Sequence, residues 1–169
     1  MPREPVLRTA TGADRDAVLA WRNHPQVRQA SLTRHEIGPV EHARWWAAVR
    51  ADPTRRVLIY ERRGTPAGVV TFAHLDDDVA VWGFYLDVAS LEAAGELLPA
   101  WLELERAAVD YAFRELGVTA LGGETLAWNT PVIALHKRFG FAVTRTYVVD
   151  VDGRPEEVVW TQLTRKDRS

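Results

Sequence analysis

Residues 97–117 read LLPAWLELERAAVDYAFRELG, and residues 118–126 read VTALGGETL. In the first stretch apolar residues recur at intervals of three and four, which predicts a long helix with one buried face. Gly117 would end this helix. The second stretch and residues 79–88 (VAVWGFYLDV) are rich in branched and aromatic residues and predict strands. A helix that links two strands of one sheet makes those strands parallel, so these residues predict an α/β fold.

The segments on either side extend this unit to a mixed sheet flanked by helices. Asn129-Thr130-Pro131 predicts the start of another helix, with proline in its first turn, and Gly140 predicts the end of that helix. Asp152-Gly153 is a favoured pair for a tight hairpin turn. The other expected elements are helices at 11–23 and from about 39 to the Asp52-Pro53 pair, and strands at 6–9, 56–61, 67–75, 142–151 and 157–163.

Composition limits the classes of protein to which this chain can belong. A length of 169 residues fits one domain, spanning 1–169, and a formal net charge of −2 argues against nucleic acid, which calls for a basic face. The sequence has no cysteine, which excludes disulfides, thiolate nucleophiles and cysteine-ligated zinc. Residues 1–8 lack the apolar core of a signal peptide, and no stretch approaches the roughly 18 apolar residues that a membrane span needs. We therefore expect a cytoplasmic protein with no membrane partner.

Two tracts of the sequence resemble a known family. Residues 111–117 (YAFRELG), Asn129 and residues 135–141 (LHKRFGF) resemble the "asparagine, helix, small turn, Gly-Phe" signature of the GNAT N-acetyltransferases. The N-terminal half is similar to a narrower branch, the amino-sugar N-acetyltransferases of the pseudaminic acid pathway, with the ribosomal-protein N-terminal acetyltransferases as relatives. The residues that carry this second likeness are Trp21-Arg22-Asn23, Val27-Arg28, Ile37, Glu41-His42 and Trp45.

The resemblance implies a GNAT fold and the transfer of an acetyl group from acetyl-CoA to a primary amine. In such proteins two central parallel strands splay apart, here residues 79–88 and 118–126, and the thioester lies between them. The strand backbone at Tyr85, Leu86 and Asp87 would then bind the pantetheine and polarise the thioester carbonyl. A neutral amine attacks the thioester directly, so no cysteine nucleophile is needed.

The sequence departs from the family at the start of the long helix. The family holds the CoA pyrophosphate there on a glycine-rich loop, whereas residues 96–102 read ELLPAWL, with Glu96 and Pro99 where backbone donors are expected. Three explanations stay open: the phosphates are held elsewhere, the donor is weakly bound or unusual, or the protein no longer acetylates. The residues that could hold the phosphates elsewhere are Arg106, Lys137 and Arg138.

Two residues are the catalytic candidates. His136 occupies the position at which many relatives place the tyrosine that protonates the leaving thiolate, and an imidazolium can serve as that acid. Glu124, expected as a buried carboxylate beside the cleft, could accept the proton of the amine, and a salt bridge to an arginine is its alternative role. His74 is a rival base. Asn129 is expected to cap its helix and, by the resemblance, to contact the CoA arm.

The acceptor amine is expected to lie near the first two helices. Arginines beside aromatic rings hold sugars, bases and diphosphates, although most of the seven tryptophans are expected in the core. Asn23 is expected to brace the loop that follows it. The spacing of His35, Glu36 and His42 fits no standard metal site, so we expect no metal. The candidate substrate-binding residues are Trp21, Arg22, Arg28, His42 and Trp45.

The resulting hypothesis is an acetyl-CoA-dependent N-acetyltransferase of a small amine, in particular a nucleotide-linked amino sugar. One alternative acceptor is a protein N-terminus or an antibiotic-like amine. Another alternative is a GNAT-shaped protein without CoA activity, which acts as a binding or accessory module or in other biosynthetic chemistry. A homodimer is compatible with each of these hypotheses.

Overall fold

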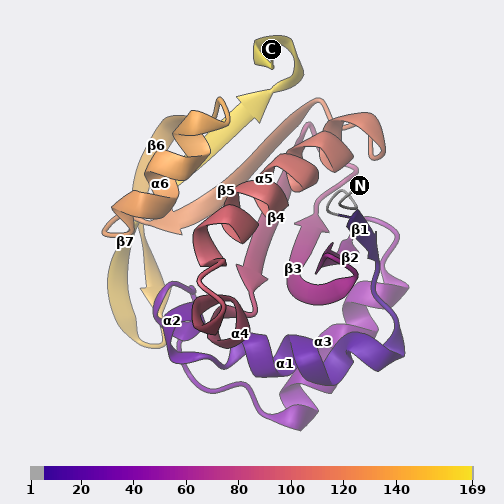
Figure 1. Cartoon of the computed structure of the whole chain (residues 1–169). Helices are drawn as coiled ribbons and strands as arrows, with labels where there is room; N and C mark the ends of the chain where they lie inside the picture. The colour runs from indigo at the N-terminus through magenta and orange to yellow at the C-terminus, as the bar shows by residue number, and fades with distance from the viewer. Residues whose placement is uncertain (1–5, 169) are drawn as a thin grey trace.

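The computed structural model describes residues 6–168, so most of the 1–8 segment lies outside the described residues (Figure 1). Its centre is a seven-stranded mixed sheet with the strand order β1-β2-β3-β4-β5-β7-β6. Among the strands of the described residues, only β4 and β5 pair in parallel. The strands are β1 (Val6–Thr9), β2 (Arg56–Arg62), β3 (Thr65–Ala73), β4 (Val79–Leu86), β5 (Ala120–Leu126), β6 (Ala142–Val151) and β7 (Arg154–Thr164). The helices are α1 (Arg15–Arg22), α2 (Pro25–Gln29), α3 (Pro39–Ala51), α4 (Val88–Ala93), α5 (Leu97–Arg114) and α6 (Thr130–Arg138).

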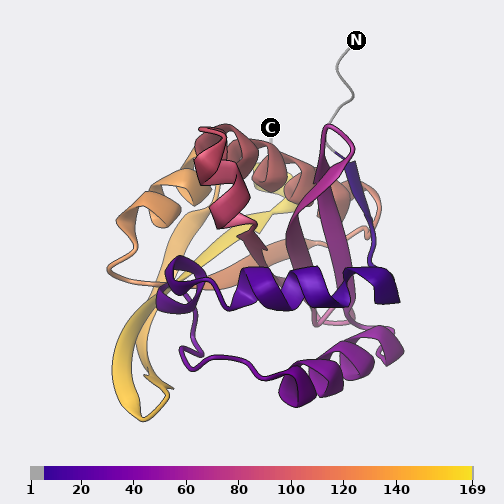
Figure 2. The same ribbon diagram turned by 60° about the horizontal axis from the view of Figure 1, so that its bottom comes forward.

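Helices cover both faces of the sheet, as Figure 2 shows with α5 on one side and α1 and α3 on the other. Because side chains alternate along a strand, β2 supplies both cores. Leu58 and Tyr60 belong to the core under α5, whereas Val57 and Ile59 pack with the core of α1 and α3. Each face is therefore closed by its own set of apolar side chains, and the predicted α/β layering is confirmed.

The parallel pairing between β4 and β5 is short. It joins Val79 to Ala120, Ala80 to Leu121 and Val81 to Gly122, after which the two strands diverge (Figure 1). Gly123 lies where they part. A Cβ atom there would come within 2.9 Å of the carbonyl oxygen of Trp82. The glycine therefore permits the close approach that precedes the divergence, as the predicted splayed strands require.

Some predicted boundaries need correction. The structure adds α2 and α4, two short helices that the sequence patterns did not indicate. Val88 opens α4 and does not close β4, because the Asp87 side chain accepts a hydrogen bond from the Ser90 N–H and caps the turn. Other predictions are confirmed: Gly117 adopts a positive φ of 67° after α5, and Gly140 one of 96° after α6.

The described part of the chain contains no helix with the length and hydropathy that a membrane crossing requires.

Candidate active site

A cavity of about 670 Å³ lies where β4 and β5 diverge. Its walls come from residues 81–86 of β4, residues 123–125 of β5, the start of α5, the adjoining side of α6 and the segment 29–33 after α2. The gap between the strands is therefore an open slot that side chains do not fill.

On β4, alternate backbone groups face this slot. The N–H of Asp87 donates to the carbonyl of Ala67 at 2.8 Å, and in the continuous antiparallel register Tyr85 pairs with Val69. Because hydrogen-bonded and non-hydrogen-bonded pairs alternate, the backbones of Tyr85 and Asp87 point towards β3, and those of Phe84 and Leu86 point towards the slot. The backbone of Leu86 thus faces the slot, where the predicted donor arm would lie, whereas the backbones of Tyr85 and Asp87 face β3.

The same alternation of backbone directions holds for β5, the opposite wall of the slot. The N–H of Ala127 donates to the carbonyl of Glu157 at 2.9 Å, which directs the odd-numbered residues of this stretch of β5 towards β7. The backbone groups of Glu124 and Leu126 consequently face the slot. Beyond the third residue pair of the parallel ladder, both walls present peptide groups that can bind an extended ligand.

His136 lines the cavity from α6 and is only 5% exposed. Its ring lies 5.4 Å from Trp82, 6.2 Å from Phe84 and 5.6 Å from Phe141, measured between centroids. Its Nδ1 is hydrogen-bonded to the carboxylate of Glu105. Its Nε2 forms no hydrogen bond with a described residue, and it is not fully enclosed by other atoms. Nε2 is therefore the ring nitrogen that the cavity can reach. His136 therefore lies on the wall of the slot, with the carboxylate of Glu105 behind its ring.

Glu105 was missed by the sequence analysis. This α5 residue is fully buried, its Oε1 contacts His136, and its Oε2 has no hydrogen-bond partner among the described residues. A signal was present, because Glu105 stands four residues after Trp101 and four before Val109 on the inward side of the helix. A carboxylate among the apolar residues on the buried side of a helix is expensive to bury without a partner.

Glu124 also lines the cavity, but the expectation that it is buried is wrong. Its side chain is exposed and accepts a 2.7 Å hydrogen bond from the Tyr147 hydroxyl. Burial, together with the neighbouring carboxylate, raises the pKa of Tyr147 to about 12. The alternative role is not seen either, because within residues 6–168 no arginine forms a salt bridge with Glu124. The rival base His74 follows β3 beside the start of β4, away from the slot.

Arg22 is the acceptor-side candidate that reaches the cavity. One guanidinium nitrogen donates to the Thr33 carbonyl at 2.8 Å, and NH1 is buried without a partner among the described residues. Burial lowers the pKa of Arg22 from its ordinary value, and no described carboxylate forms a salt bridge with it. A buried guanidinium on a cavity wall that has no carboxylate partner favours an anionic ligand.

The other acceptor candidates do not line the cavity. Trp21 is buried in the core of α1 and α3, and His42 is buried between Trp45 and Trp46, with ring centroids 5.6 and 5.8 Å away. Arg28 donates to the Arg34 carbonyl at 2.9 Å. The rings of Trp21, Trp45 and Trp46 hold α3 against the sheet.

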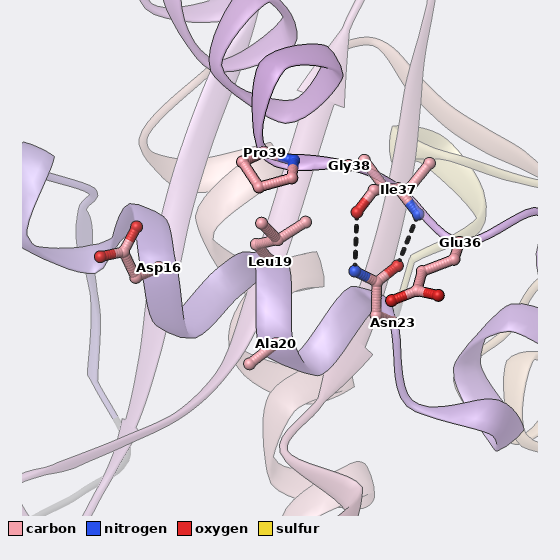
Figure 3. Close-up of a pocket in the computed structure, with 8 residues that line it drawn as sticks. All are labelled: Asp16, Leu19, Ala20, Asn23, Glu36, Ile37, Gly38 and Pro39. Atoms are coloured by element: carbon pink, nitrogen blue, oxygen red, sulfur yellow. Dashed lines mark hydrogen bonds between the residues drawn. The ribbon is translucent and has the colours of Figure 1, made fainter.

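Asn23 braces the following loop, as predicted. Its side-chain amide donates to the carbonyl of Ile37 at 2.8 Å and accepts from the N–H of the same residue at 2.7 Å (Figure 3). A second, open hollow of about 550 Å³ lies beside this contact, between α1 and the loop. It contains none of the catalytic candidates.

The residues expected to hold the cofactor are dispersed. Asn129 lines the cavity, but its side chain makes no capping hydrogen bond, contrary to expectation. Arg106 lies over the ring of Phe139, 5.8 Å from its centroid, outside the cavity. Lys137 and Arg138 are exposed on α6 and also lie outside it.

The start of α5 is occupied by a carboxylate. Glu96 stands at the N-cap and pairs with Arg62 at 3.3 Å and Arg63 at 2.8 Å. These contacts lie at the start of the helix, where the resemblance leads us to expect the pyrophosphate. Among residues 6–168, no group of three or more histidine, aspartate or glutamate side chains is placed to hold a metal ion.

The loop between α2 and α3 is fastened to the tip of the C-terminal hairpin. The Asp152 carboxylate accepts from the N–H groups of Arg34 and His35 at 2.7 and 2.9 Å. The His35 ring lies between two carboxylates, with Nδ1 3.3 Å from Asp152 and Nε2 3.0 Å from Glu41. We call the three residues His35, Glu41 and Asp152 the loop clamp.

The loop clamp makes stability depend on pH. Glu41 and then Asp152 raise the pKa of His35 above 6.5, so its contribution is complete below pH 6.5 and is lost as the pH rises through the raised value. The N–H of Arg34 and the His35 ring lower the pKa of Asp152 below 3.8, and this contribution is lost in acid. We expect the Tm advantage of the wild type over His35→Gln to be largest between these limits and to shrink towards pH 9. A Tm difference that stays constant from pH 5 to 9 would contradict this.

The comparisons with known proteins agree with the geometry. Residues 6–142 match the family described as "Acetyltransferase (GNAT) domain". The chain is also similar to Acetyltransferase PseH of Campylobacter jejuni subsp. jejuni serotype O:23/36 (strain 81-176), with 23% identity over 128 residues, which cover 76% of each protein.

Solved structures share the fold. Spermidine N-acetyltransferase from Vibrio cholerae, in complex with CoA and spermine, has a TM-score of 0.82 at 16% identity over 97% of each chain. Mycobacterium smegmatis RimJ in complex with CoA-disulfide has a TM-score of 0.79 at 15% identity, over 96% of this chain and 82% of that one. Campylobacter jejuni N-acetyltransferase PseH has a TM-score of 0.67 at 15% identity, over 96% of this chain and 99% of that one. The family match spans most of the sequence and the fold agrees with it, so the chain belongs to the GNAT acetyltransferase family, whose members use acetyl-CoA as the acetyl donor.

Proposed function

We propose that the acceptor is the primary amine of an amino sugar that carries a phosphate, as a nucleotide-linked sugar does. The observation that carries this proposal is the guanidinium of Arg22, which lines the cavity and forms a salt bridge with no carboxylate among residues 6–168. A guanidinium binds phosphate oxygens through strong charge-assisted hydrogen bonds, and such a contact would balance its charge. The resemblance of residues 21–45 to the amino-sugar N-acetyltransferases supports the same class of acceptor.

An aromatic surface at the mouth of the cavity supports a ring-bearing acceptor. Trp128 lines the cavity although it is 54% exposed, an unusual position for so large an apolar side chain. Aromatic faces bind sugar and base rings. Trp128 therefore offers a stacking surface on the β5 side, across the slot from the β4 wall.

In the proposed reaction, the slot positions the thioester and three groups act on the reacting atoms. The free backbone groups of Phe84 and Leu86 bind the extended arm of the donor and polarise its carbonyl. Glu124, held by Tyr147, accepts the proton of the attacking amine directly or through water. His136 donates a proton to the sulfur as the carbon–sulfur bond breaks.

The donor phosphates need a site other than the start of α5, where Glu96 and Pro99 stand. We assign them to the exposed basic residues Lys137 and Arg138 of α6, with Arg106 of α5 as a third cation. Asn129, whose amide makes no capping bond, would contact the arm of the donor from the cavity wall.

Thermal unfolding and turnover test the proposal together. Acetyl-CoA at 100 times its Kd is expected to stabilise the protein by about 2.7 kcal/mol. Release of the CoA thiol is then measured with a nucleotide-linked amino sugar, the matching free amino sugar, an aminoglycoside and a peptide with a free N-terminus. We expect the highest kcat/KM for the nucleotide-linked sugar. A higher value for the peptide or the aminoglycoside would replace the acceptor, and the absence of both stabilisation and turnover would favour a protein without CoA activity.

A further inference from the structure

Gly83 stands in the middle of β4 and lines the cavity, although glycine weakens the interior of a strand. We propose that Gly83 is a specificity-determining residue, because the bare backbone that it leaves on the cavity wall binds the ring of the acceptor. We call Gly83 and its neighbours Thr71 and Tyr85 the ring subsite. The inference rests on the proposed function for the class of acceptor and deepens it, but binding to the subsite can be measured without turnover.

Every other glycine in the described strands is explained by the atoms packed against it. A Cβ atom at Gly68 would lie 2.9 Å from Cδ2 of Leu86, and one at Gly122 would run into the ring of Trp160. Gly123 permits the close approach of β4 and β5 before the two strands part. These three glycines are buried, so a side chain has no room at any of them.

Gly83 differs from them in each respect. Its φ is not positive, so its backbone conformation does not call for glycine. Beyond the adjacent residues, a Cβ atom there would have one described neighbour within 4 Å, Oγ1 of Thr71 at 3.4 Å, a distance at which a methyl group fits. Gly83 is half-buried and borders the cavity. Since neither conformation nor packing accounts for it, the remaining role of a glycine inside a strand is to let a ligand approach the backbone closely.

The ring subsite lies on the side of the sheet that α1 covers. Trp82 and Phe84 point the other way, into the core under α5. Because side chains alternate along a strand, Gly83 shares its face with Tyr85, which packs against the core of α1 and α3. Arg22 lines the cavity from α1 on this same side. A ring on Gly83 would therefore occupy the half of the cavity that contains the guanidinium assigned to the acceptor phosphate.

The border of the ring subsite suits a ring that carries hydroxyl groups. Thr71 is the partner of Gly83 in the register with β3 and also lines the cavity. Its hydroxyl forms only a long, 3.4 Å hydrogen bond with the Gly83 carbonyl, so it can exchange this bond for one to a ligand. A sugar ring has faces of C–H groups and hydroxyls at its edge, which match a bare backbone beside a polar side chain. A straight-chain amine has no such face and does not need the space.

Gly83→Ala and Gly83→Val test the inference by filling the ring subsite in two steps. Calorimetry in the presence of CoA gives the Kd of two amines that both carry a phosphate, an amino sugar phosphate and the straight-chain phosphoethanolamine. We expect the Kd of the amino sugar phosphate to rise about threefold in Gly83→Ala and about tenfold or more in Gly83→Val, as overfilling a packed site does. The Kd of phosphoethanolamine should stay nearly the same. Gly12→Ala, outside the cavity, is the matched control and should leave both values unchanged.

The stability of the variants separates a filled subsite from a damaged fold. Alanine and valine are favoured over glycine inside a strand, so Tm should be unchanged or higher, and the Kd of acetyl-CoA should be unchanged. A lower Tm for Gly83→Ala would show that packing requires the glycine and would overturn the inference.

The outcomes also distinguish this inference from the proposed function. If no amine is acetylated but the two Kd values diverge as expected, the proposed function fails and the ring subsite stands. If amines are acetylated and Gly83→Val binds the amino sugar phosphate as tightly as the wild type, the function stands and the inference is wrong. Equal losses for both amines, or no binding of the amino sugar phosphate to the wild type, would contradict it as well.

Discussion

His136→Phe lowers kcat by about 10²- to 10⁴-fold at pH 7, the range that a general acid contributes. Its effect on the Kd of acetyl-CoA is expected to be much smaller, because we assign the donor arm to the strand backbone at Phe84 and Leu86. Thiol release under saturating acetyl-CoA gives kcat, and calorimetry gives the Kd. Equal turnover in the variant and the wild type would remove His136 from the mechanism.

The same variant also has a structural cost that must be separated from its catalytic effect. His136→Phe leaves Glu105 fully buried without its partner, and breaking a buried ion pair in this way costs about 3–5 kcal/mol. The double variant Glu105→Leu/His136→Phe removes the carboxylate as well. We expect the double variant to recover much of the lost stability and none of the lost kcat. If kcat recovers together with stability, the loss reflects unfolding and not the missing acid.

Arg22→Gln is expected to raise KM for a phosphate-bearing acceptor by about 10²-fold, since removing one partner of a buried charge contact costs about 2–5 kcal/mol. The Kd of acetyl-CoA should change little. A neutral amine of similar size provides the internal comparison, because its KM should be nearly the same in both proteins. Arg50→Gln, on the exposed side of α3, is the matched control.

The contrast between acceptors decides the role of Arg22. If KM rises equally for charged and neutral amines, the change lies in the segment that Arg22 supports through the Thr33 carbonyl, and not in recognition of an anion. If KM for the phosphate-bearing acceptor is unchanged, the proposal that this guanidinium binds the acceptor is wrong.

Much of the fold follows from local patterns. The long helix α5 and its terminal Gly117 could be predicted because apolar spacing and a positive φ each leave a clear trace in the sequence. The helices α2 and α4 could not, because they have five and six residues, too few to show a period. Their caps, the side chains of His24 and Asp87, act only once the chain has turned.

The site was harder to predict, because its chemistry depends on the directions in which backbone and side-chain groups point. The sequence indicated His136 and Leu86 but not which backbone groups of β4 face the slot, since that choice depends on the register with β3. Trp21 and His42 belong to motifs that resemble a binding surface, but the structure buries Trp21 in the core of α1 and α3 and His42 on the inner side of α3. Glu105 escaped notice because a charged residue on a helix is most often solvated. Only the packing of α6 against α5 reveals its partner.

The loop clamp has a consequence for how the protein is made. His35 and Asp152 are 117 positions apart, and the salt bridge of Arg34 with Glu156 spans 122. Contacts between such distant parts of a chain form late, because a long loop must close first. During synthesis the loop that contains Arg34 and His35 therefore emerges long before the hairpin that fastens it. A nascent chain that ends before β7 would contain the residues of β4 and β5 but could not fasten this loop, so discrimination among amines would be the last property that the growing polypeptide acquires.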